Sequence, residues 1–92
     1  MKKRIVDAEV EEFLAIPLYP YEEYDTIRKI ELNWVIYYDE DGKEVTRRPI
    51  ICIVTGSHMY QTHEKECIEF ASKQEIEELI SALKSILREW EG

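Results

Sequence analysis

Two cysteines and two histidines are the residues of this chain best suited to metal or nucleophilic chemistry: Cys52, His58, His63 and Cys67. Thiolate and imidazole groups bind zinc, but structural zinc sites present paired ligands two to four residues apart, and here each ligand is isolated. A cysteine nucleophile would also need an orienting third group and an oxyanion site, which no motif supplies. We therefore predict no catalytic residue, no metal, no cofactor and no enzymatic activity. Both cysteines are expected to be inert within strands in a reducing cytoplasm.

A segment rich in tyrosine and acids, stiffened by Pro17 and Pro20, is the stronger candidate for binding. Tyrosine offers a large rigid contact area together with a hydroxyl group, which is typical of binding surfaces. The alternative is that these rings cover one end of the core. The predicted partner-binding residues are Tyr19, Tyr21, Glu22, Glu23, Tyr24 and Asp25.

Charge and length limit the classes of partner. The chain has 92 residues, with 12 Lys and Arg against 20 Asp and Glu, so its formal net charge is -8. This length predicts one domain over residues 1–92. The negative charge opposes non-specific binding to phosphate backbones and anionic membranes, and no apolar run approaches the roughly 20 residues that span a bilayer. We expect a cytoplasmic protein whose protein partner has a basic surface.

The clearest element is a helix from Ser72 to Trp90. Ser72 and Glu75 form a predicted capping box, which satisfies backbone N–H groups at the start of a helix. Apolar residues then recur at spacings of three and four, which places them on one stripe. The stripe consists of Ile76, Leu79, Ile80, Leu83, Leu87 and Trp90, and Ile86 widens it. Such a stripe must pack on something.

Strands are predicted upstream of this helix. Residues 27–38 alternate apolar and polar, residues 45–55 form a β-rich return strand, and residues 66–71 form a short further strand. Residues 4–16 fit either a short helix or an edge strand, and we favour a strand. If Asp41 and Gly42 form a two-residue turn, Leu32 faces Ile51; if Gly42 lies in a bulge after a three-residue loop, Leu32 faces Ile50. The predicted fold is therefore α+β, an antiparallel three- or four-stranded meander with one C-terminal amphipathic helix packed on one face.

This order of elements, over about residues 27–90, resembles the single-strand-binding transcriptional coactivator family. In that family paired helices form a dimer and the sheet holds extended nucleic acid. The resemblance implies that aromatic and cationic residues of the hairpin contact nucleic acid: Lys29, Trp34, Tyr37, Tyr38, Arg47 and Arg48. It also raises the expectation of a homodimer formed through the C-terminal helix.

Two functions are therefore expected from the sequence. The first is a small acidic, non-enzymatic protein that binds and regulates or inhibits another macromolecule. In a sharper form, its acids imitate the phosphates of nucleic acid on a nucleic-acid enzyme, as in small inhibitors encoded by viruses and mobile elements. The alternative is a single-stranded nucleic-acid-binding protein, in which cations on one sheet face form a groove.

Overall fold

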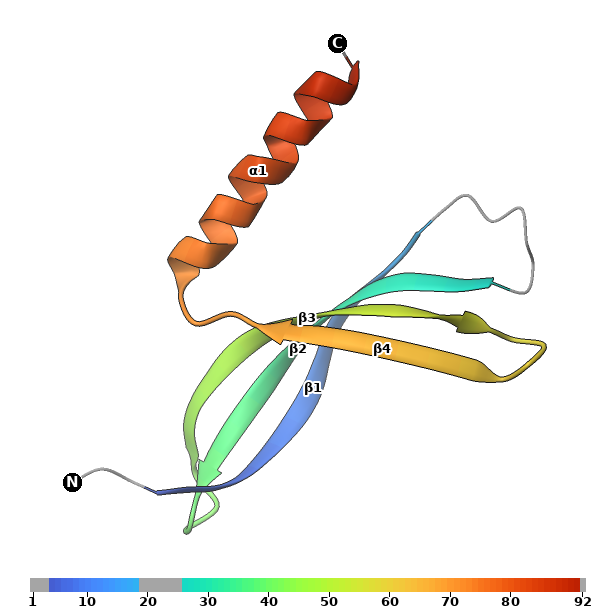
Figure 1. The fold of residues 1–92 in the computed structure, drawn as a ribbon. Coiled ribbons are helices and arrows are strands. Elements are labelled where there is room, and N and C mark those ends of the chain that lie inside the picture. Colours follow the sequence, from blue (N-terminus) through green and yellow to red (C-terminus); the bar gives the residue numbers. More distant parts are fainter. Residues whose placement is uncertain (1–3, 19–25, 92) are drawn as a thin grey trace.

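The computed structural model describes residues 4–18 and 26–91, which form an antiparallel sheet followed by one helix (Figure 1). The elements are β1 (Ile5–Pro17), β2 (Thr26–Asp39), β3 (Glu44–Ser57), β4 (Thr62–Glu69) and α1 (Lys73–Glu91). The strands pair in the order β1-β2-β3-β4, so the sheet is a meander of four strands. The predicted α+β class is thus confirmed.

Both outer strands carry charged residues, and both were harder to predict than the central pair. Residues 4–16 belong to strand β1, as favoured, and bulges near Val6 and Phe13 interrupt its pairing with β2. Strand β4 begins at Thr62, earlier than the predicted Glu66. Its first residues show no apolar alternation because this part of the strand is exposed, and charges on an exposed edge discourage pairing with other chains.

The hairpin between β2 and β3 combines features of both predicted alternatives. Gly42 has a φ of 77° and its N–H donates to the Asp39 carbonyl at 3.0 Å, while Asp39 N–H donates to the Lys43 carbonyl at 2.9 Å. This is a three-residue loop with Gly42 in the bulge position. A further bulge at Val45 then shifts the pairing by one residue, so Leu32 faces Ile51, as in the first register.

This register divides the apolar residues between two faces of the sheet, because successive side chains of a strand point to opposite sides. We call one side the isoleucine face; it carries Leu14, Ile16, Ile30, Leu32, Ile51, Ile53 and Ile68. The other is the cystine face, which carries Glu31, Asn33, Cys52, Val54, Lys65 and Cys67. The two cysteines are joined by a disulfide, so the expectation of separate, reduced thiols is wrong for this structure.

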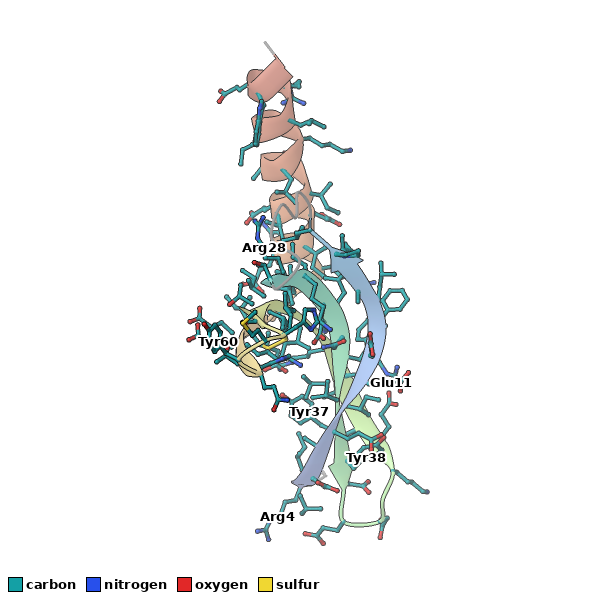
Figure 2. The ribbon with its side chains drawn as sticks, turned by 90° about the vertical axis from the view of Figure 1, so that its right-hand side faces the viewer. Arg4, Glu11, Arg28, Tyr37, Tyr38 and Tyr60 are labelled. Carbon is teal, nitrogen blue, oxygen red and sulfur yellow. A yellow bond between two sulfur atoms is a disulfide. The ribbon has the colours of Figure 1, made fainter. Side chains whose placement is uncertain are left out.

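Helix α1 begins as predicted but does not pack on the sheet. Ser72 Oγ accepts a bond from Glu75 N–H, and a Glu75 carboxylate oxygen accepts from Ser72 N–H, which confirms the capping box. The helix then extends away from the end of β4 in both views (Figures 1 and 2), and the substantial contacts between elements are those of neighbouring strands. The expected packing of the helix on one face of the sheet is therefore not confirmed.

The resulting molecule is long and thin. Its extents are 53 × 38 × 16 Å and its Cα radius of gyration is 17.1 Å, against about 12 Å for a compact domain of this length. The fully buried apolar side chains among the described residues are those of Ile36, Cys52 and Val54. The core is therefore small and lies within the sheet.

Candidate functional site

The predicted partner-binding residues, Tyr19, Tyr21, Glu22, Glu23, Tyr24 and Asp25, lie outside the described residues. The segment that they occupy joins the end of β1 to the start of β2. Residues on both sides of this segment, Pro17, Leu18 and Thr26, line a pocket together with His58 and His63.

The alternative nucleic-acid-binding residues do not form one surface. Trp34 and Arg47 share the side of the isoleucine face, and the Arg47 guanidinium carbon lies 5.7 Å from the centre of the Trp34 ring. Lys29, Tyr37 and Arg48 lie on the side of the cystine face. Because the sheet separates the two groups, a single extended strand cannot contact all of them across one face.

Several of these residues are also held by acids. The guanidinium of Arg47 pairs with the Glu44 carboxylate at 2.6 Å, and this hydrogen bond lowers the pKa of Glu44 and raises that of Arg47. The Tyr37 hydroxyl donates to Glu69 at 2.6 Å, which raises the pKa of Tyr37. The predicted contacts for nucleic acid are thus partly neutralised within the chain.

Glu31 forms an ion-pair network on the cystine face. Its carboxylate lies 2.8 Å from the Lys65 ammonium and 3.1 Å from that of Lys29. Hydrogen bonds from Lys65 and then from Lys29 lower the pKa of Glu31 from 4.5 to about 2. The two lysines flank Val54 in the sheet register, so the network bridges β2 and β4 above this side chain, which is 0% exposed.

The disulfide lies directly beside this network. Cys52 and Cys67 are opposed on β3 and β4, with their Cα atoms 4.0 Å apart. The hypothetical two-cysteine, two-histidine zinc set is therefore not assembled, because both thiols are used in the bond. Within residues 4–18 and 26–91, no group of three or more His, Cys, Asp and Glu side chains is placed to hold a metal ion.

His58 and His63 instead line a pocket of about 410 Å³ at the far end of the sheet. Its other walls come from the end of β1 and the start of β2: Pro17, Leu18, Thr26, Ile27, Arg28 and Lys29. The lining is mixed: it combines cationic and imidazole side chains with apolar ones. Thr26 adds a hydroxyl group to the same lining.

The outer strand β1 presents a row of acids. Asp7, Glu9 and Glu11 project to one side of the sheet. Their partners on β2 are Tyr38, Ile36 and Trp34, which are every second residue of that strand and therefore share one face. Glu9 accepts a hydrogen bond of 2.6 Å from the Tyr38 hydroxyl and raises the pKa of Tyr38 to about 12. Glu11 has no ion-pair partner within the described part of the chain. Figure 2 shows Glu11 and Tyr38 on the same side of the sheet, with Tyr37 on the other.

Large apolar side chains are exposed among these acids and on the helix. On β1, Val10 and Phe13 are exposed, Phe13 to 67%. On the isoleucine face, Ile53 is 55% and Ile68 64% exposed. Along α1 the whole second half of the apolar stripe is open, and Trp90 reaches 84%. Uncovered apolar patches of this extent mark surfaces that contact other macromolecules.

Sequence reasoning missed the ion pairs of Glu31 and the disulfide. Both depend on how β2, β3 and β4 align with one another. Within the described residues no helix combines the length and apolar character needed to cross a membrane.

No protein-family model, curated protein or solved structure matches this chain.

Proposed function

We propose that this is a small acidic, non-enzymatic protein that binds a basic surface on another protein and thereby regulates or inhibits it. The observation that carries the proposal is the acidic row on the outer strand β1, formed by Asp7, Glu9 and Glu11. The outer strand also exposes Phe13, in the bulge between Glu12 and Leu14, and Val10, which projects to the side opposite the row. The pattern provides both charge for attraction and apolar area for affinity.

The spacing of this row supports the sharper version, in which the partner is a nucleic-acid enzyme. Residues two apart on a strand are separated by about 6.7 Å. Successive carboxylates on β1 are therefore spaced comparably to successive phosphates of a nucleic-acid strand. A basic channel that holds phosphates would accept such a row, and occupying it would block access of the nucleic acid.

Charge pairing favours this proposal over single-stranded nucleic-acid binding. Lys29, Arg47 and Lys65 are each ion-paired within the sheet. Glu12 has no ion-pair partner among the described residues, and Glu11 interacts with Arg47 only at longer range, without an ion pair. The sheet therefore offers more uncompensated negative than positive charge to a partner, which repels phosphates and attracts lysine and arginine.

The test compares two probes by fluorescence titration: a lysine- and leucine-rich peptide and a single-stranded oligonucleotide. We expect the peptide to bind, with an affinity that weakens as salt rises, and the oligonucleotide not to bind. Replacing Asp7 with asparagine and Glu11 with glutamine, which removes two charges of the row, should weaken peptide binding several-fold. The matched control replaces Glu77 and Glu89 of α1, which removes the same charge away from β1.

Binding of the oligonucleotide with a steep salt dependence, in the absence of peptide binding, would overturn the proposal in favour of the nucleic-acid alternative. Equal loss of peptide binding in the β1 and α1 variants would show that net charge alone, and not the β1 row, attracts the peptide.

A further inference from the structure

We infer that the protein is a reciprocal homodimer in which helix α1 of one copy covers the isoleucine face of the other copy. The inference concerns assembly, and it is independent of the binding function proposed for β1. It rests on two exposed apolar surfaces of the same chain, on the way in which α1 is attached to β4, and on the charges that border both surfaces.

The isolated chain leaves both of its main apolar surfaces open. The isoleucine face contains a shallow pocket of about 250 Å³, lined by Ile30, Ile51, Ile53, Glu66, Cys67 and Ile68. The stripe on α1 exposes Ile80, Leu83, Ile86, Leu87 and Trp90. A helix stripe and an apolar sheet face are the two surfaces that α+β folds pack together, yet here they are not in contact.

The link between β4 and α1 is hydrogen-bonded in a way that directs the helix outward. Phe70 N–H donates to the Pro49 carbonyl at 2.9 Å, so the chain is still attached to β3 just before the helix. Ala71 and Ser72 N–H groups both donate to the Glu75 carboxylate. These bonds hold the link in the conformation that directs α1 away from its own sheet, and a second copy can reach the stripe without changing that conformation.

The charges at the borders of the two surfaces are complementary. Lys73 and Lys84 lie along one margin of the α1 stripe by helical periodicity. Glu64 and Glu66 lie on β4 at the border of the isoleucine face, and neither has an ion-pair partner among the described residues. A helix laid on the face with its lysine margin towards β4 pairs these charges, and the lysine stems add apolar cover.

The available area is sufficient for a stable dimer. Two reciprocal helix-on-sheet contacts would bury on the order of 2,000 Å² in total, which lies within the range of specific interfaces. The elongated shape of the single chain is then explained, because the dimer supplies the core that one copy lacks. A two-fold axis relates the contacts, as in most homodimers.

Sedimentation velocity over micromolar to submillimolar concentrations tests the inference, with a dimer expected at twice the 11.0 kDa chain mass. Leu83→Glu with Leu87→Glu should give monomers, and so should Ile53→Glu. The matched controls are Ser81→Glu on the opposite side of α1 and Thr46→Glu on the cystine side of β3, and both should remain dimeric.

A wild-type monomer would overturn the inference, as would a dimer that survives the double leucine variant. A dimer that survives Ile53→Glu but not the leucine variant would also overturn it, since that result indicates helix-to-helix pairing.

If circular dichroism shows that Ile53→Glu does not fold, a pair of charge-reversal variants tests the inference instead. Lys84→Glu should raise the dimer dissociation constant about two- to fivefold per pair, and adding Glu66→Lys should restore it. Absence of restoration overturns the inference.

Discussion

Removing the carboxylate of Glu31 should remove one defined contribution to the acid sensitivity of this fold. The pKa of Glu31 is lowered from 4.5 to about 2 in the folded chain, so the folded state favours the ionised form. The stabilisation is therefore present above the unfolded pKa and is lost as pH falls through the folded pKa, over roughly pH 5 to 2. Glutamine at position 31 cannot ionise and should show no such loss.

The magnitude follows from the shift and from solvent exposure. A pKa that falls from 4.5 to about 2 corresponds to at most about 3 kcal/mol at neutral pH. The side chains of Lys29 and Lys65 are 35% and 41% exposed, while that of Glu31 is 14% exposed. Because water screens both ammonium groups, we expect about 1–2 kcal/mol.

The assay is urea unfolding followed by circular dichroism at pH 7, 5, 3 and 2, at one protein concentration and with the disulfide intact. Wild type should lose about 1–2 kcal/mol more than Glu31→Gln between pH 5 and 2. Glu89→Gln is the control, since Glu89 has no ion-pair partner in the described part of the chain and should follow wild type. Parallel pH profiles for wild type and Glu31→Gln would refute the reasoning.

Three further changes test the local structure. Ser72→Ala removes the helix cap and should cost about 1 kcal/mol, read from urea unfolding. Gly56→Ala should destabilise the β3–β4 hairpin, because a Cβ there would lie 2.2 Å from the Thr62 carbonyl oxygen, and a lowered melting temperature would show it. Replacing Cys52 and Cys67 together with alanine should lower the free energy of unfolding by about 3 kcal/mol, since the disulfide closes a loop with a sequence separation of 15. Thiol titration of the unfolded wild type should find no free thiol.

The features that were predictable from sequence are those with short-range signals. The capping box and the spacing of apolar residues from Ile76 to Trp90 defined the helix, and Asp41-Gly42 located the hairpin. The direction of α1 was not predictable, because an apolar stripe shows that a helix face needs cover but not which surface supplies it. Of the two register alternatives, each was right for part of the hairpin, because Val45 introduces a bulge that no residue type signals.

The candidate site was less predictable for a related reason. Glu31 meets Lys65 only because β2, β3 and β4 align in one particular register, and the same alignment opposes Cys52 to Cys67. Neither pairing leaves a pattern in a local window of sequence. The acids of β1 were visible in the sequence and an edge strand was favoured for them, but the side to which each acid projects required the pairing with β2.

The position of the disulfide determines how the molecule would respond to mechanical load. Helix α1 is joined to the sheet through the last residues of β4, so tension on the helix would unzip β4 from β3, beginning at Glu69 and Ile68. The next pair is Cys52 and Cys67, where a covalent bond stops the unzipping. A single-molecule pulling experiment should therefore show a longer extension on rupture after reduction than before it.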